Sequence, residues 1–530
     1  MTHAYLQGPW LLLLLGLTQP LGAQSTRAER TGYRQTSSYA DVTAFLDSLQ
    51  RLRADLRLDT LGTSAEGRPI PLVIASRPLV ADPAAARRGG KPVVYIQGNI
   101  HGGEVEGKEA ALMLLRDLTV GRLAPLLDSL VLLVVPIYNA DGNEHVASGA
   151  ENRPGQNGPP VVGRRVNGRG LDLNRDYVKM EAPETRGAAA LLRAWNPELV
   201  VDLHTTNGSH HGYVLTYAPG LSPNDTPATA YVRDRFLPAL RERMARRHRQ
   251  ATFLYGNFRN QDPDSLNQGW ETYDARPRFG TNWIGLRGRL AVLSEAYSNA
   301  DFATRVSATY NFAREILSLA AEERATIRSV VRRSDKSRPD SVTVRSALGP
   351  PVARDVVAEL TEPAGEGDGG YARRRRTGVF RTIRMPVYDR FVAARREARP
   401  AAYLFPATLT PIAELLRRHG IVVGRLAERW LGEVERFKID GVTEGQPFEG
   451  HRPVALEGRW GAAQPGQVER GWFLVSTDQP LGLLAAYLLE PASEDGVATW
   501  NLLDGSLVVG GESPIVRSRH AVRAGVAVLP

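Results

Sequence analysis

Residues 93–104 read VVYIQGNIHGGE, and this stretch decides the fold prediction. It begins with β-branched and aromatic residues, which favour a buried strand. It ends with His101 and Glu104, which are separated by two glycines. Glycine allows a tight backbone turn, so an imidazole and a carboxylate can face one point. The stretch therefore predicts a buried strand that delivers two polar side chains at its carboxyl end.

Three further runs have the apolar composition of buried strands: residues 130–137 (LVLLVVPI), 199–203 (LVVDL) and 290–293 (LAVL). Helices are predicted between them, over residues 106–118, 183–195 and 227–248. Continuous apolar strands that alternate with helices are typical of a largely parallel sheet covered on both faces. We therefore predict an α/β fold, with a mostly parallel or mixed sheet flanked by helices.

The pattern changes after residues 332–340 (RRSDKSRPD), whose polar and charged composition predicts a linker. Residues 341–530 contain short strand-like runs such as 471–475, separated by Gly and Pro turns. Helical sequence occurs there only around 410–419. We therefore predict an α/β domain over 24–331, the linker, and one or two mostly β accessory domains over 341–530.

The N-terminus has the composition of a leader sequence. Residues 10–17 (WLLLLLGL) form a short apolar run, and Leu21-Gly22-Ala23 follows it. This pattern predicts a signal peptide over 1–23 and an exported protein, because the run is too short to anchor well in a membrane. A buried helix or a membrane anchor is the alternative. The chain has no cysteine, which excludes disulfides, thiolate metal sites and a cysteine nucleophile.

The formal net charge is +9, from 66 basic and 57 acidic residues. A basic surface can attract anionic polymers or membrane surfaces. The densest basic run, Arg373–Arg376, follows Gly-rich sequence and lacks interleaved aromatic residues. We therefore expect a solvated loop there and no nucleic-acid partner.

Polar side chains follow or end three of the four predicted strands. His101 and Glu104 follow the first strand, His204 follows the third, and Glu295 lies in the fourth. Ligands of α/β sheets bind at the carboxyl ends of the strands, so these residues are expected to converge on one rim. Two histidines and a glutamate form a ligand set for zinc that leaves the fourth position open for water.

Two more motifs complete an ordered set: Asn139-Ala140-Asp141-Gly142, and Leu171-Asp172-Leu173-Asn174-Arg175. Together with the residues at the strand ends, they make residues 39–325 resemble the M14 family of zinc carboxypeptidases. The sequence departs from the family pattern only at Ala140, where proline is usual. The short interval between Asn174-Arg175 and His204 is closer to the cytosolic-type branch than to the digestive enzymes.

The resemblance implies one zinc ion per catalytic domain, held by His101, Glu104 and His204. It implies that Glu295 is the general base, which takes a proton from the zinc-activated water and passes it to the leaving amine. Asp172 resembles the carboxylate that orients a zinc-binding histidine. The expected substrate is the C-terminus of a peptide or protein.

The resemblance also implies which residues hold the substrate. Arg165 is similar to the arginine that stabilises the oxyanion, with Arg164 as the alternative. Asn174 and Arg175 resemble the clamp for the terminal carboxylate, a task that suits the planar fork of arginine. Tyr273 is at about the spacing of the tyrosine that closes over the substrate.

Other interpretations remain open at this point. The same scaffold can support an amidase or deacylase, for example one that trims peptidoglycan peptides, or a non-catalytic binding protein. The β-rich region could instead carry the main role, as a cell-surface or glycan-binding module. Glu271 and Glu106 are the alternative bases. We expect His145, His210 and His211 to be loop or pocket-wall residues rather than ligands.

Overall fold

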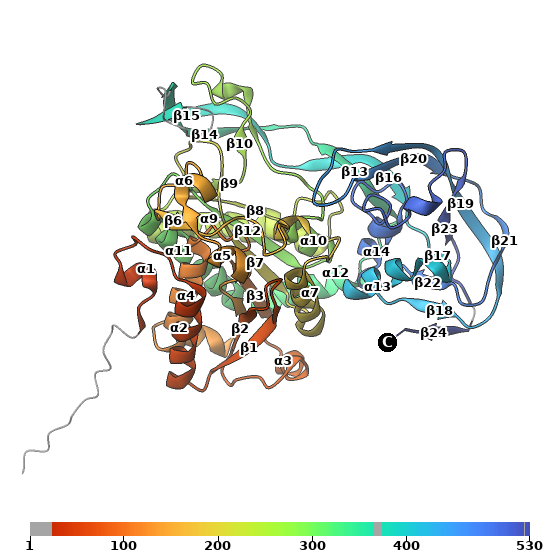
Figure 1. Ribbon diagram of the computed structural model, residues 1–530, viewed down its shortest axis with the longest axis horizontal. Coiled ribbons are helices and arrows are strands. Elements are labelled where there is room, and N and C mark those ends of the chain that lie inside the picture. Colours follow the sequence, from red (N-terminus) through yellow and green to blue (C-terminus); the bar gives the residue numbers. More distant parts are fainter. Residues whose placement is uncertain (1–23, 364–373, 524, 530) are drawn as a thin grey trace, which may run out of the picture.

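The structure is a computed structural model and describes residues 24–363, 374–523 and 525–529. The predicted signal peptide (1–23) and Arg373 of the arginine run lie outside the described residues. Figure 1 shows a helix-covered sheet formed by the N-terminal part of the chain, beside a second body formed by the C-terminal part. In the described part of the chain, no helix is both long and apolar enough to cross a membrane.

The first body is built on a mixed eight-stranded sheet, ordered β1-β2-β4-β3-β7-β12-β8-β9. The four central strands, β4-β3-β7-β12, are parallel neighbours and are the four strands that the apolar runs predict. The predicted α/β class is therefore confirmed. The strands are β1 (Leu56–Thr63), β2 (Pro69–Ala75), β3 (Val93–Gly98), β4 (Val131–Val135), β7 (Leu199–Thr205), β8 (Leu215–Ala218), β9 (Thr252–Leu254) and β12 (Leu290–Ala296).

Both faces of the sheet are buried, which is why its central strands are apolar throughout. In β3, Val93 and Tyr95 belong to one apolar core, and Val94 and Ile96 belong to the other. Helices α3 (Pro83–Gly89), α7 (Pro183–Trp195) and α10 (Gly280–Leu286) contribute to the first core. Helices α2 (Tyr39–Leu52), α4 (Glu106–Thr119), α9 (Leu237–His248), α11 (Phe302–Glu322) and α12 (Arg324–Lys336) contribute to the second.

Two predicted segments differ locally from the structure. The helix expected over 227–248 contains a π-helical turn, Val232–Phe236, just before α9. Pro238, in the first turn of α9, has no N–H to donate to the preceding turn. Residues 332–336 of the expected linker form the end of α12, because Ile327, Val330 and Val331 bury one face of that helix.

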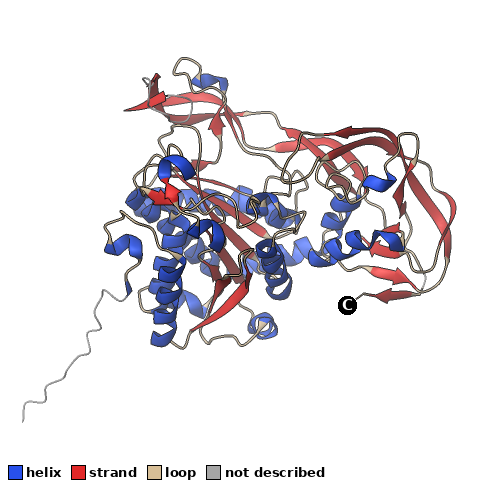
Figure 2. Ribbon diagram, in the orientation of Figure 1, coloured by secondary structure: helices blue, strands red, loops and turns tan. Residues whose placement is uncertain are grey.

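The C-terminal part consists mainly of strands, as predicted (Figure 2). Helix α13 (Thr410–Arg418) is the expected helix. Helix α14 (Gly482–Leu489) has no polar face, so it lacks the helical periodicity that would reveal it. The strands of the largest sheet are β17 (Ala402–Phe405), β18 (Gly424–Leu426), β19 (Trp430–Glu444), β20 (Val454–Trp460), β21 (Gln464–Val468), β22 (Phe473–Ser476), β23 (Glu512–Ser518) and β24 (Val526–Val528).

The part of the chain between α12 and β17 contains a long hairpin, which extends to the first body (Figure 1). It consists of β14 (Val352–Pro363) and β15 (Arg374–Tyr388), and β15 pairs with β11 (Trp270–Glu271). Strands β13 (Ser341–Leu348) and β16 (Phe391–Ala398) pair beside it. Arg374–Arg376 therefore lie in a strand and not in the expected loop, because they pair with Thr361, Glu362 and Pro363. Arg375 and Arg376 are exposed to solvent, as expected.

Candidate metal centre and active site

Three strands deliver the polar side chains to one edge of the sheet. His101 lies three residues beyond the last residue of β3, His204 lies in β7 and Glu295 in β12. Glu295 and His204 are register partners across the parallel β12–β7 pair. The expected convergence of these residues therefore occurs in the structure.

The turn between His101 and Glu104 is held by Asn99, whose φ is +62°. Its side-chain amide donates to the carbonyl oxygens of His101, Gly102 and Glu104 at 3.3, 3.1 and 3.1 Å. A Cβ at Gly102 would lie 2.3 Å from the carbonyl carbon of Gly142. Because that separation is far below van der Waals contact, the close approach requires glycine.

His101, Glu104 and His204 are buried, and their ligand atoms lie within 4.8 Å of one another. The Nδ1 atoms of His101 and His204 face the two carboxylate oxygens of Glu104, at 2.8 and 2.9 Å. The Nε2 atoms face Asp172 at 3.1 Å and Asp202 at 3.0 Å. A carboxylate thus contacts the Nε2 atom of each imidazole, an arrangement common around metal-bound histidines. The donor set and its support fit zinc.

The charges around this set favour the ionised glutamate. Burial raises the pKa of Glu104, but His101 and Arg153 outweigh burial and hold the pKa well below its usual range. Burial also raises the pKa of Asp172, and His101 and Arg165 again outweigh it, so that carboxyl stays ionised. Glu104 and Asp172 are therefore both ionised, and neither has to release a proton before it contacts a cation.

Glu295 lines a cavity of about 160 Å³ together with the three candidate ligands. Its Oε2 has no hydrogen-bond partner among the described residues. Burial raises its pKa to about 8, although His204 opposes the shift. A buried carboxyl group with an unpartnered oxygen in this cavity is placed for proton transfer.

The two alternative bases lie elsewhere. Glu106 is fully buried, and its Oε1 accepts a hydrogen bond from Arg305 Nε at 3.2 Å. Glu271 pairs with Arg259 at 2.7 Å, and both side chains are 39% exposed. Neither lines the cavity of Glu295.

Arg165 lines the cavity, whereas Arg164 does not. Arg165 Nε donates to Asp172 Oδ2 at 2.9 Å, and its Nη1 lies 3.7 Å from Glu104. Arg164 Nη2 instead donates to the carbonyl oxygen of Asn167 at 2.7 Å. The geometry therefore favours Arg165 over Arg164 as a residue that could touch a substrate.

Asn174 and Arg175 also line the cavity. Asn174 Oδ1 accepts from the N–H of Gly280 at 2.9 Å, which fixes its amide next to His204. The Arg175 guanidinium lies 4.0 Å from the centroid of the Phe279 ring. Its nearest carboxylate contact is with Asp172, at 3.9 Å. The N–H groups of Arg175 can therefore still donate hydrogen bonds to another anion.

Tyr273 lines the same cavity, and its hydroxyl donates to Asn282 Oδ1 at 3.3 Å. Burial raises its pKa, and Glu295 adds to the shift, so it remains a neutral phenol. Tyr255 packs against it with ring centroids 5.6 Å apart and is a second tyrosine of the cavity wall.

Of His145, His210 and His211, only His210 lines a cavity at the site. It lines the neighbouring cleft described below. His211 is buried against Tyr297, with ring centroids 4.2 Å apart. His145 pairs with Glu66 at the surface, at 2.5 Å.

Sequence reasoning missed three residues of the site: Arg153, Asp202 and Tyr255. Arg153 Nη1 donates to Glu104 Oε1 at 3.0 Å, and its Nη2 donates to the carbonyl oxygens of Thr205 and Thr206. The signal for Asp202 was available, because residues two apart in a strand point to the same face. No local pattern marks Arg153 or Tyr255.

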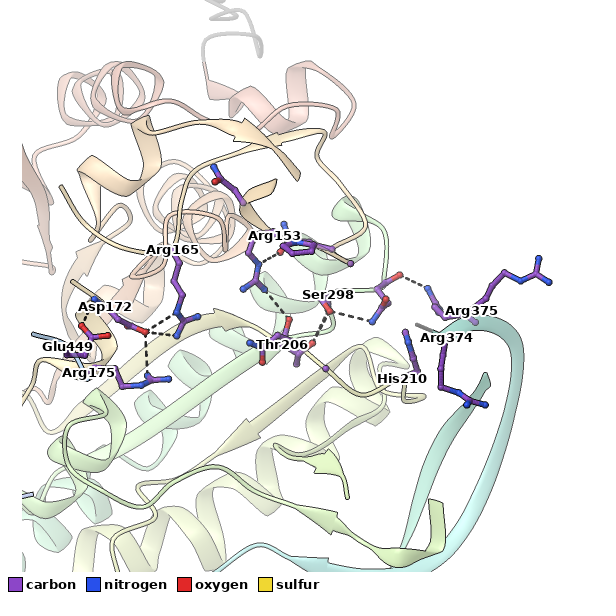
Figure 3. A pocket seen from close by; sticks show the side chains of 18 of the residues that line it. Arg153, Arg165, Asp172, Arg175, Thr206, His210, Ser298, Arg374, Arg375 and Glu449 are labelled. Atoms are coloured by element: carbon purple, nitrogen blue, oxygen red, sulfur yellow. Dashed lines mark hydrogen bonds and ion pairs between the residues drawn. The ribbon is translucent and has the colours of Figure 1, made fainter. Parts of the chain in front are cut away.

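A cleft of about 830 Å³ adjoins the cavity and shares Arg165 and Arg175 with it (Figure 3). One of its walls comes from the C-terminal part, through Phe448 and Glu449. These residues belong to a tight turn in which Phe448 and His451 exchange backbone hydrogen bonds of 2.8 and 3.0 Å. Glu449 and Gly450 have φ of +49° and +80°, the left-handed values of a type I′ turn.

The turn is attached to the segment that carries Arg175. Glu449 Oε2 accepts from the backbone N–H of Asp172 at 3.1 Å, and the Glu449 carbonyl accepts from Lys179 Nζ at 3.3 Å. His451 Nε2 lies 2.8 Å from Glu181 Oε1. The C-terminal part therefore helps to hold residues 172–181 in place.

We expect Glu449→Ala to raise KM for a free-acid peptide by up to about tenfold, or about 1.4 kcal/mol, with kcat nearly unchanged. The variant loses the hydrogen bond that positions Asp172 and, through it, Arg175. Glu449→Gln is the matched control, because it removes the charge but keeps an oxygen acceptor. Steady-state kinetics on both variants checks this. An equal rise of KM in both would assign the effect to charge instead.

Carboxypeptidases are among the known proteins to which this chain is similar. The family model described as zinc carboxypeptidase matches residues 42–274. "Carboxypeptidase 2" of Trichophyton rubrum is 25% identical over 492 residues, covering 86% of this chain and 81% of that protein. "Carboxypeptidase D" of Mus musculus is 34% identical over 172 residues, covering 28% of this chain and 12% of that protein. The solved carboxypeptidase A from Helicoverpa armigera is 16% identical at a TM-score of 0.41, covering 55% and 75% of the two chains.

The α/β sheet, the buried His–Glu–His set at its edge and the matching family model define a zinc metallocarboxypeptidase, a hydrolase that acts on peptides. Residues 42–274 match the M14 family model of zinc carboxypeptidases, in agreement with the ordered motifs of the sequence.

Proposed function

We propose that the protein removes C-terminal residues from peptides, with one zinc ion held by His101, Glu104 and His204. The observation that carries the proposal is the buried ligand set with Glu295 in the same cavity. Zinc bound there would supply Lewis-acid polarisation of the scissile carbonyl and acidify a water molecule. The remaining chemistry belongs to side chains of the chain itself.

Glu295 accepts the proton of the attacking water and passes it to the leaving amine. Its unpartnered Oε2, in the same cavity as the three candidate ligands, supports this role. Arg165 donates hydrogen bonds to the carbonyl oxygen as negative charge develops on it. Tyr273 covers the substrate from the cavity wall. Glu295 is buried, which strengthens its interactions with nearby charges.

Arg175, helped by Asn174, binds the terminal carboxylate of the substrate. Arginine suits this task because its planar fork makes two parallel hydrogen bonds to a carboxylate. Arg175 lies in the wall of the same cavity as Glu295. A carboxylate held by Arg175 therefore limits cleavage to the last peptide bond.

We expect Arg175→Ala to raise KM and to lower kcat/KM for free-acid peptides by about 2–5 kcal/mol, or roughly 30- to 5000-fold. Arg175→Lys should recover only part of the loss, because an ammonium cannot reproduce the fork. Arg169→Ala, an exposed residue of the same loop, is the matched control. The measurement is kcat/KM on a peptide and on its C-terminal amide. A loss of similar size on the amide would contradict the clamp and favour an amidase or deacylase.

We also infer that the protein is exported. The support is the apolar run of residues 10–17 followed by Leu21-Gly22-Ala23. Expression of the full chain in a bacterial host should yield, outside the cytoplasm, a product whose N-terminus lies near residue 24. A full-length product retained in the cytoplasm would contradict export.

A further inference from the structure

The cleft beside the zinc-site cavity has two chemically different ends. Its lining holds two carboxylates, Asp172 and Glu449, and both lie with Arg165 and Arg175 at one end (Figure 3). The opposite end is formed by His210, Ser298, Asn299 and three arginines of β15, Arg374, Arg375 and Arg376. We call this second part the arginine end. Within the described lining, the arginine end has no carboxylate.

The direction of a bound peptide follows from the proposed function, on which this inference rests. If Arg175 holds the terminal carboxylate, the preceding residues leave the cavity through the cleft and run away from Arg175. Figure 3 places Arg153 and Thr206 between Arg175 and the arginine end. The residues before the scissile bond therefore pass toward His210 and β15.

Arg375 and Arg376 are anchored but keep free donor capacity, whereas Arg374 donates to Thr361 and lies 3.8 Å from Asp262. Arg376 Nε donates to the buried Glu359 at 2.7 Å, and its Nη1 donates to the carbonyl oxygen of Asn299 at 2.6 Å. Arg375 makes an ion pair with Glu362 in which the two side chains are 65% and 48% exposed. Exposed pairs contribute only about 0–1 kcal/mol, so another carboxylate can replace Glu362 at little cost.

His210 is a second feature of this end. Only 5% of the residue is exposed, and neither ring nitrogen has a hydrogen-bond partner among the described residues. A neutral imidazole has one donor and one acceptor, and leaving both unpaired in a buried position is costly. Because His210 lines the cleft, a peptide group there would pair with these nitrogens once the ring turns toward it.

We propose that the arginine end binds acidic side chains upstream of the scissile bond, so that the protein prefers peptides with Asp or Glu before the C-terminal residue. Two arrangements carry this inference: three arginines at the end that upstream residues reach, of which Arg375 pairs only with an exposed carboxylate outside the cleft lining, and an unpaired buried histidine beside them. The hairpin that supplies the arginines lies outside the part of the chain that the family model matches. The preference would therefore be a property of this chain's C-terminal part.

The test uses the zinc-loaded full chain and pairs of free-acid peptides with the same C-terminal residue. In each pair, one peptide carries Glu and the other Gln at one position, scanned from the second to the sixth before the C-terminus. At low ionic strength we expect a kcat/KM ratio of about tenfold in favour of Glu at one or more positions, which falls as salt is added. A ratio near one at every position overturns the inference.

Variants of β15 localise the effect. Arg375→Ala should lower the Glu/Gln ratio at least threefold, and Arg375→Glu should bring it below one. Arg384→Ala is the matched control, because Arg384 lies on the same strand, is 66% exposed, pairs with Asp355 at 3.3 Å and does not line the cleft. An equal loss in Arg384→Ala would contradict a specific site.

If the parent protein hydrolyses no peptide, the proposed function fails. The Kd values of the Glu and Gln peptides of each pair then still decide whether the cleft selects acidic sequences.

Discussion

Glu295→Gln is expected to abolish peptide hydrolysis while leaving the fold and the zinc content intact. The amide has nearly the same shape as the carboxylate but cannot accept a proton from water. General acid–base catalysis contributes about 10²–10⁴-fold, so kcat should fall by at least about a hundredfold. Hydrolysis of a free-acid peptide, zinc content by elemental analysis and thermal unfolding together check the prediction.

Glu271→Gln is the control for this variant. Glu271 is a surface carboxylate paired with Arg259 and lies outside the cavity. Its substitution should leave kcat unchanged. If Glu295→Gln turns over within roughly tenfold of the parent, the loss is too small for a general base, and the proton acceptor is another group.

The second large effect is expected for His204→Ala, which should lose both zinc and activity. His204 supplies one of three candidate ligands, and the two that remain cannot complete the set that zinc requires. The measurement is the zinc content per chain after dialysis. His145→Ala is the matched control, because His145 is a surface histidine paired with Glu66. Zinc retained near one per chain in His204→Ala would remove His204 from the site.

The fold was predictable where burial dictates composition. The central strands are apolar on both faces because helices cover both sides, so their runs stand out in the sequence. Helix α7 has the predicted bounds, since its apolar residues follow helical spacing up to Asn196. Helix α14 was not predicted, because a helix buried on all sides shows no periodicity.

The candidate site was predictable to the extent that its residues end strands. His101, His204 and Glu295 follow from that placement alone, whereas the roles of Arg165 and Arg175 came from resemblance to a family. Arg153 and the turn at Glu449 were not predictable, because tertiary packing brings them to the site. Glu449 meets Asp172 from 277 residues further along the chain, and no periodicity encodes such a contact.

The most direct test of the central claim compares one peptide as the free acid and as the C-terminal amide. The zinc-loaded protein is incubated with each, and the products are followed over time by mass spectrometry. The account predicts stepwise loss of the C-terminal residue from the free acid, with the amide left largely intact because it offers Arg175 no carboxylate. Internal fragments, or equal cleavage of both peptides, would contradict a carboxypeptidase that recognises its substrate through Arg175.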